Sequence, residues 1–291
     1  MSIRTILVVL EVESAVEQLL DGALEIARAM EGHLEILLLQ GDPEQLLADC
    51  AFTPLGSIPI QALNEGRDAA ETEIKRRFTA WRDARDLPGD IVDHRLRTTY
   101  ARWSSWQGRA EIGLLRRGRL ADVIVMALQP RRLGLRSALV DAALFDSGRP
   151  VLFLPGVPVV PPLGRVALAW NDSLQAVRCL ACSLPFLHEA ERVFVLSISS
   201  GPDDIGGDSA SIPAEDVVEA MTWQGINASL VRVAPKSGET IGARMLREAA
   251  DLDVGLLALG AFTHSRVREA LLGGVTRHVL DHATIPLLMI H

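Results

Sequence analysis

Residues 253–290 read DVGLLALGAFTHSRVREALLGGVTRHVLDHATIPLLMI, and this stretch has the clearest fold pattern in the chain. It begins with an apolar run, Asp253 to Leu259, which predicts a buried strand. A segment with helical periodicity follows at Val275 to His282, and the run PLLMI at 286–290 predicts another strand. Strand, loop, helix and strand in this order are typical of a βαβ unit, in which the two strands lie parallel.

The same alternation extends outward through the whole chain. In the C-terminal half the other predicted strands are 165–170, 192–198 and 228–233, and the other predicted helices are 174–187, 213–223 and 239–250. In the N-terminal half the predicted strands are 4–10, 33–39, 91–97, 122–128 and 150–154, and the predicted helices are 14–30, 65–84, 101–117 and 138–145. Because the strands are continuous apolar runs that alternate with helices, we expect parallel sheets with both faces covered.

The chain therefore reads as two copies of one plan. Its length of 291 residues also fits two domains. A proline-rich stretch, LPGVPVVPPLG at 154–164, separates the copies and suits a stiff connector. We predict an α/β protein with two Rossmann-like domains, each a five-stranded parallel sheet with helices on both faces. The predicted domains are 1–155 and 165–291, joined by a linker at 156–164.

Composition excludes several classes of function. Hydrophobic residues make up 48% and charged residues 23%, which is the balance of a globular protein. The net charge of −8 and the aromatic content of 4% argue against a nucleic-acid-binding protein. Three cysteines do not form a disulfide framework. With no targeting segment or membrane span predicted, we expect a cytoplasmic protein.

The loop after the strand at 253–259 has the chemistry of a phosphate site. Gly260 ends that strand, where a missing β-carbon lets a ligand approach the backbone. Gly273 and Gly274 precede a helix, whose first free N–H groups favour an anion. Side chains that could add donors or positive charge are Thr263, Arg266 and Thr276. The alternative is a glycine-mediated helix start with no ligand.

The duplicated plan resembles a tandem universal stress protein, most strongly at Leu257 to His291. ATP-binding members of that family carry Gly-x-x-Gly, nine residues, then Gly followed by Ser or Thr. Gly260 and Gly273 match the first and third glycines, whereas Thr263 replaces the second glycine and Gly274 replaces Ser or Thr. The resemblance implies ATP or ADP as the cofactor, with or without Mg²⁺. Its contacts would include the backbone at Val275.

A second family feature follows the strand at 165–170. There the family places an aspartate in a turn that contacts the nucleoside, and this chain has Asn171, Asp172 and Ser173. Asn171 replaces the aspartate and can still hydrogen-bond a ribose hydroxyl or an adenine edge, and Asp172 could substitute for it. The alternative is that Asp172 or Ser173 only caps the following helix.

The N-terminal copy lacks these features. Its loop after the strand at 122–128 is five residues shorter, Gln129 stands in place of the first glycine, and no Gly-Gly pair precedes the helix. Val12 stands where the family aspartate would be. We therefore predict one nucleotide site per chain, in the second domain, and no catalytic or metal-ligating residues.

The resemblance also implies how the domains associate. Domains of this family pair through their last strands, so the strands at 150–154 and 286–290 are expected to pair within the chain. Both are uncharged runs that would be sticky as open edges. A homodimer is a further expectation, with no nucleic-acid or membrane partner. Function by sensing or protein interaction is favoured, and the alternatives are a nucleotide-free interaction module or a slow ATPase or phosphotransferase.

Other motifs have plainer interpretations. Cys179 and Cys182 form a CxxC motif, but it lies two turns into a helix, so packing is favoured over redox chemistry. His278 and His282 have a spacing that could bind a metal, but no third ligand is evident. The segment from Trp103 to Trp106 falls in a predicted helix, where packing is the expected role.

Overall fold

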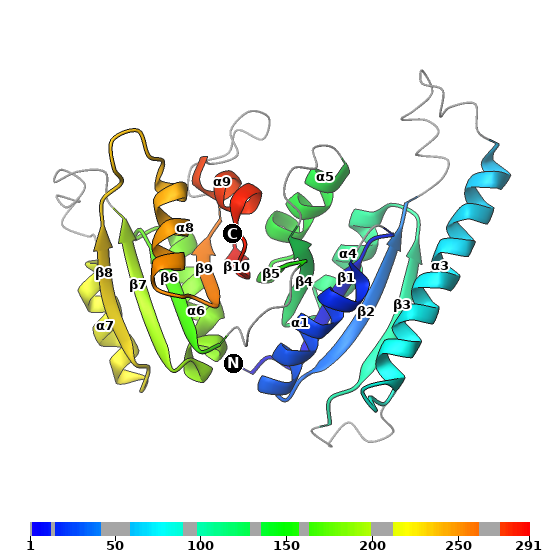
Figure 1. Ribbon diagram of the computed structural model, residues 1–291, viewed down its shortest axis with the longest axis horizontal. Coiled ribbons are helices and arrows are strands. Elements are labelled where there is room, and N and C mark those ends of the chain that lie inside the picture. The colour runs from blue at the N-terminus through cyan, green and yellow to red at the C-terminus, as the bar shows by residue number, and fades with distance from the viewer. Residues whose placement is uncertain are drawn as a thin grey trace. The chain divides into compact units, whose positions relative to one another are not determined.

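The computed structural model describes residues 2–12, 15–41, 59–89, 98–128, 135–156, 163–198, 212–261 and 274–291. The chain divides into two compact units. The N-terminal unit comprises Ile3–Ala127 and Leu133–Arg149, and the C-terminal unit is mainly Pro150–His291. Both units have the predicted α/β organisation, with buried apolar strands between helices (Figure 1).

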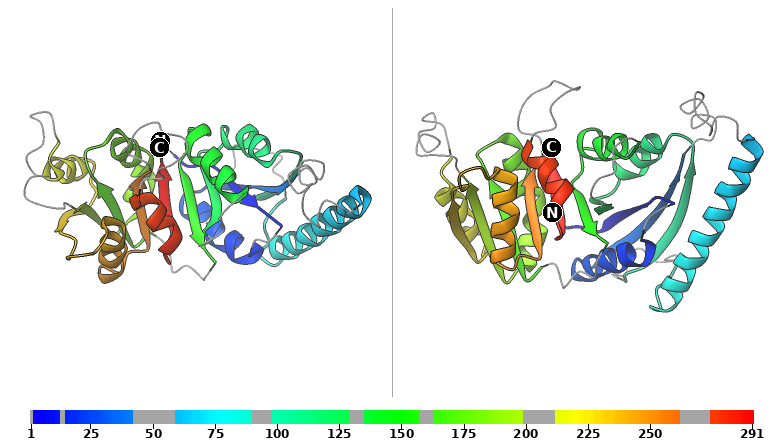
Figure 2. Two further views of the ribbon diagram at one scale, coloured as in Figure 1. Left: turned by 90° about the horizontal axis from the view of Figure 1, so that it is seen from above. Right: turned by 45° about the horizontal axis from the view of Figure 1, so that its top comes forward.

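The N-terminal unit contains a parallel sheet with the strand order β3-β2-β1-β4. Its strands are β1 (Thr5–Leu10), β2 (His33–Gln40), β3 (Ala101–Gln107) and β4 (Val123–Leu128). Its helices are α1 (Val16–Ala29), α3 (Ile60–Asp83), α4 (Ala110–Gly118) and α5 (Leu135–Asp141), which continues into a π-helical turn, η2 (Ala142–Asp146). Helices α1 and α3 cover one face of the sheet, and α4 and α5 cover the other (Figure 2).

The predicted helix at 101–117 is wrong in its first half. Ala101–Gln107 is strand β3, paired in parallel with β2, and helix α4 begins only at Ala110. The two tryptophans explain the difference, because residues three apart in a strand point to opposite faces. The ring of Trp103 lies 5.3 Å from that of Phe78 on α3. A β-carbon at Gly113 on α4 would lie 2.4 Å from the indole of Trp106. The strand predicted at 91–97 lies outside the described residues.

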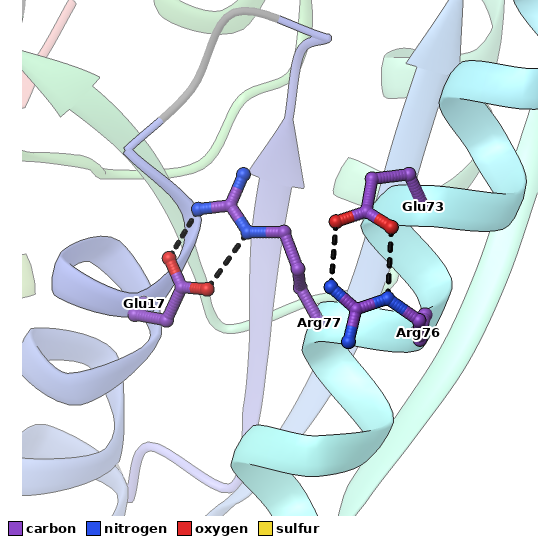
Figure 3. A network of polar contacts seen from close by, with 4 residues as sticks. All are labelled: Glu17, Glu73, Arg76 and Arg77. Carbon is purple, nitrogen blue, oxygen red and sulfur yellow. Dashed lines mark hydrogen bonds and ion pairs between the residues drawn. The ribbon is translucent and has the colours of Figure 1, made fainter.

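Salt bridges join α1 to α3 in the N-terminal unit. Arg77 on α3 makes a bidentate contact with Glu17 on α1, and Arg76 pairs with Glu73 within α3 (Figure 3). The Arg77 guanidinium lowers the pKa of Glu17. Nearby, Trp81 Nε1 donates to Asp21 Oδ1 over 2.8 Å. Both inter-helix contacts join residues 60 positions apart in sequence, so they hold the long helix α3 against α1.

The C-terminal unit has the strand order β5-β10-β9-β6-β7-β8. Its strands are β5 (Val151–Pro155), β6 (Arg165–Trp170), β7 (Arg192–Ile198), β8 (Ala228–Val233), β9 (Leu256–Gly260) and β10 (Leu287–Ile290). Its helices are α6 (Leu174–Glu189), α7 (Ala214–Trp223), α8 (Ile241–Asp251) and α9 (Gly274–His282). Helices α6 and α7 lie on one face of this sheet, and α8 and α9 lie on the other (Figure 2).

Strand β5 is packed with the C-terminal unit, although it follows the N-terminal unit in sequence. It pairs with β10 in antiparallel register, with Leu287 opposite Phe153 and Met289 opposite Val151. The other strand pairs in the described part of this unit are parallel. All residues of both β5 and β10 are buried, which is the state expected of uncharged strands that would otherwise form open edges.

The core of each unit is aliphatic, as the low aromatic content predicts. Phe78, Phe153 and Phe186 are the largest fully buried side chains, and most of the other core residues are Leu, Ile, Val and Ala. Within the described ranges, no helix combines the length and apolar character that crossing a bilayer requires.

Candidate functional site

The candidate site lies where the winding of the C-terminal sheet reverses. Strands β6 and β9 are parallel neighbours, with Val166 opposite Leu256 and Leu168 opposite Ala258. From β6 the chain crosses to β7 on one side, and from β9 it crosses to β10 on the other. In open α/β sheets, ligands bind in the crevice at the carboxyl ends of two such strands. Those ends carry Asn171 and Gly260, as the sequence predicts.

Gly260 permits a close approach of protein backbone. A β-carbon there would stand 2.6 Å from the carbonyl carbon of Gln175 and 2.8 Å from the nitrogen of Ala176. Both atoms belong to the first turn of α6, which therefore packs directly on the end of β9. The packing of α6 against β9 therefore requires glycine at this position, whether or not a ligand binds there.

The turn after β6 caps helix α6. Ser173 Oγ accepts a hydrogen bond from the N–H of Ala176 over 3.1 Å, so Ser173 is the N-cap. The same hydroxyl donates to Asn171 Oδ1 over 2.7 Å. The capping interpretation of the sequence is confirmed for Ser173, and the side-chain oxygen of Asn171 is already engaged as an acceptor.

Asp172 is bound to the backbone of its own domain. It adopts a left-handed conformation with φ of 55°. Its Oδ2 accepts from the N–H of Ile212 over 3.0 Å. The carbonyl of Ile212 in turn accepts from Trp170 Nε1 over 3.3 Å. No sequence signal pairs residues that lie 40 positions apart, so this contact could not be predicted.

The other predicted contacts belong to the start of α9. Gly274 is exposed at the first position of this helix, and a β-carbon added to it would meet no atom within 4 Å. Val275 is half-buried, and Thr276 is buried at 4% exposure. The remaining predicted contacts, Thr263, Arg266 and Gly273, lie outside the described residues.

The CxxC motif has the environment of a packed core. Cys179 is buried on α6, and this burial, with a smaller effect of Cys182, strongly raises the pKa of its thiol. A redox-active dithiol needs the opposite shift, because the thiolate is the reactive form. The packing interpretation therefore fits the structure.

The two histidines on α9 are stacked on each other. The rings of His278 and His282 lie 4.2 Å apart, and His282 Nδ1 contacts the carbonyl oxygen of His278 at 2.9 Å. Burial, with a smaller contribution from His282, lowers the pKa of His278. Among the described residues, no three His, Cys, Asp or Glu side chains are grouped so that they could hold a metal ion.

The candidate loop between β9 and α9 lies in a part of the chain that matches a known protein family. The Universal stress protein family model matches residues 213–291, which include β9, α9 and β10. A search of curated protein sequences found no match.

Solved structures extend the likeness to the whole chain. A universal stress protein from Archaeoglobus fulgidus is 16% identical with a TM-score of 0.67, covering 98% of this chain and 95% of its own. A putative universal stress protein from Pseudomonas aeruginosa is 16% identical with a TM-score of 0.56, covering 99% and 93%. The C-terminal region of this chain thus matches the universal stress protein family, and the chain over nearly its full length has the fold of universal stress proteins.

Proposed function

We propose that the C-terminal domain binds ATP or ADP at the carboxyl ends of β6 and β9, and that the protein acts by sensing this nucleotide rather than by catalysis. The observation that carries the proposal is the position of the glycine-bearing loop. It follows β9 at the switch point of the sheet and falls within the matched family region. Sheets wound in this way bind nucleotides at this point.

The start of α9 is the part of the site suited to phosphate. The first N–H groups of a helix have no partner within the helix, and the helix dipole favours an anion there. Gly274 is exposed and leaves open space at this end of α9. The start of α6 is less suited, because Ser173 already accepts from the N–H of Ala176. We therefore assign the phosphates to the start of α9, with Thr263 and Arg266 of the preceding loop as contacts predicted from the sequence, and the nucleoside to the turn at Asn171.

Thermal unfolding with and without millimolar Mg-ATP tests the proposal. A ligand that binds only the folded state at about a hundred times its Kd stabilises that state by about 2.7 kcal/mol. The expected result is a rise of several degrees in the melting temperature of the C-terminal domain. An unchanged melting temperature at saturating nucleotide would contradict nucleotide binding.

A pair of matched variants locates the binding. Gly273→Asp introduces a carboxylate at the predicted phosphate position and should abolish the thermal shift. Gly134→Asp makes the same change in the corresponding loop of the N-terminal half and should preserve the shift. Equal shifts in both variants would place the nucleotide elsewhere.

A nucleotide-free interaction module is the second candidate. It is favoured by one observation: Asn171 Oδ1 and Asp172 Oδ2 both accept hydrogen bonds from the protein itself. Denaturing the purified protein and identifying any released small molecule by chromatography distinguishes the two. Bound ATP or ADP supports the sensing role, whereas a protein that carries and binds no nucleotide supports the second candidate.

A slow ATPase at the same site would release phosphate from ATP. Phosphate release that persists in Gly273→Asp would show that the activity comes from a contaminating enzyme.

We propose that the protein works in the cytoplasm and that nucleotide binding changes how its domains or two copies of the chain associate. Light scattering after size-exclusion chromatography, with and without Mg-ATP, measures this directly. A molar mass and elution volume that do not respond to nucleotide would contradict a role through association.

A further inference from the structure

The residue Ile212 is held from both sides at the end of strand β6. Its N–H donates to Asp172 Oδ2 over 3.0 Å, and its carbonyl oxygen accepts from Trp170 Nε1 over 3.3 Å. Trp170 is the last residue of β6, and Asp172 follows two positions later. Both backbone groups of one residue are therefore tied to the strand end that borders the proposed site. We call this arrangement the Ile212 clamp.

The clamp uses an unusual backbone conformation. Asp172 has φ of 55°, a region that most L-residues disfavour and that Asp and Asn tolerate best after glycine. In this conformation the carboxylate reaches a backbone N–H 40 residues away. Trp170 is 6% exposed, so the other half of the clamp is anchored in the core.

We propose that Asp172 is a positioning residue, which acts on the nucleotide through Ile212 rather than by touching it. This inference rests on the proposed function. Ile212 is 44% exposed, and its backbone is held at the carboxyl end of β6, so we infer that its apolar side chain borders the turn assigned to the nucleoside. A flat, partly apolar nucleoside is the part of a nucleotide that gains from such a surface, because removing apolar area from water is favourable. Asp172 thus fixes one wall of the nucleoside end of the site.

The competing role is direct contact, in which the charge of Asp172 binds a ribose hydroxyl or Mg²⁺. Three substitutions separate the two roles. Asp172→Asn keeps a side-chain acceptor and tolerates the left-handed backbone, but it removes the charge. Asp172→Ala removes the acceptor and strains the backbone. Asp172→Gly removes the acceptor and relieves the strain.

A second left-handed aspartate in the same domain provides the matched control. Asp253 has φ of 53° and lies before β9, at the end of that strand opposite to Gly260. Its carboxylate is 92% exposed and contacts Arg165 at 3.6 Å. Asp253→Ala therefore makes the same change in backbone and charge without touching the Ile212 clamp.

Calorimetric titration with Mg-ATP gives the first readout. The expected result is that Asp172→Ala and Asp172→Gly each raise the Kd about fivefold, the effect of losing one intramolecular hydrogen bond. Asp172→Asn and Asp253→Ala should remain within about twofold of the unaltered protein. A loss in Asp172→Asn as large as in Asp172→Ala would overturn the proposal in favour of direct contact. Unchanged binding in Asp172→Ala and Asp172→Gly would overturn it as well.

Hydrogen exchange at the Ile212 amide gives a second readout that needs no nucleotide. Exchange should be slow in the unaltered protein and in Asp172→Asn, and faster in Asp172→Ala and Asp172→Gly. If the unaltered protein binds no Mg-ATP, the proposed function is wrong. The exchange rate of the Ile212 amide then still tests whether Asp172 holds Ile212. Exchange that is equally fast in all forms shows that no clamp holds Ile212, whether or not nucleotide binds.

Discussion

The backbone of Gly260 lies so close to Gln175 that a β-carbon at position 260 would stand 2.6 Å from the carbonyl carbon of that residue. This contact joins the end of β9 to the first turn of α6. Because the opposing atoms are backbone, they cannot move aside as a flexible side chain would. The glycine that marks the candidate nucleotide loop is therefore also a packing residue of the switch point.

Gly260→Ala is expected to destabilise the C-terminal domain by about 1–3 kcal/mol, because overpacking forces backbone shifts. Urea unfolding followed by circular dichroism measures the change. Gly274→Ala is the control, since a β-carbon there meets no atom within 4 Å. If the two variants unfold at the same urea concentration, the close contact at Gly260 is not a constraint.

Gly113→Ala is expected to destabilise the N-terminal domain by about 1–3 kcal/mol, because a β-carbon there would lie 2.4 Å from the indole of Trp106. Gly66→Ala lies within α3, where a β-carbon meets no atom within 4 Å. That variant should instead stabilise the protein by up to about 1 kcal/mol through helix propensity. Thermal unfolding compares them, and a stabilising Gly113→Ala would contradict the packing of Trp106 on α4.

The Glu17–Arg77 contact is expected to contribute a small, pH-dependent coupling of about 0.2–1 kcal/mol, because both side chains are partly exposed. Arg77 lowers the pKa of Glu17. The coupling is therefore fully present above the unfolded-state pKa of Glu, and it is lost as the pH falls through the lower folded-state value.

A double-mutant cycle with Glu17→Gln and Arg77→Met measures this coupling at neutral pH and again near pH 3. The coupling should shrink in acid, and it should also shrink in high salt at neutral pH. A coupling that keeps its size in acid would show that the ionised form of Glu17 is not what binds Arg77.

Cys179 is expected to resist alkylation in the folded protein, because burial raises the pKa of its thiol and withholds it from reagents. Mass mapping after iodoacetamide treatment, with and without denaturant, tests this. Modification of Cys179 should require denaturant. Formation of a Cys179–Cys182 disulfide under mild oxidation of the folded protein would instead support a redox role.

The order of strands and helices was largely predictable, because the spacing of apolar residues within a segment indicates its secondary structure. Residues 166–170 and 256–259 are apolar without interruption, and both runs are buried in neighbouring parallel strands. The segment at 101–107 was not predictable in this way. Its partners, Phe78 on α3 and Gly113 on α4, come from different parts of the chain, and only their packing shows that Trp103 and Trp106 face opposite sides.

In the candidate site too, local contacts were predictable and long-range contacts were not. Ser173 was predictable as a helix cap, since capping is set by residues three apart. The role of Asp172 was not, because its partner Ile212 lies 40 positions away.

The α/β plan, its duplication and the glycine-bearing loop after β9 follow from the sequence, because periodicity, turn residues and loop length are properties of neighbouring residues. The packing of α6 on Gly260 and the hydrogen bond from Ile212 to Asp172 are evident from the tertiary structure alone. These depend on which distant backbones approach one another, and that is set by the pairing of strands and the packing of helices across the whole sheet.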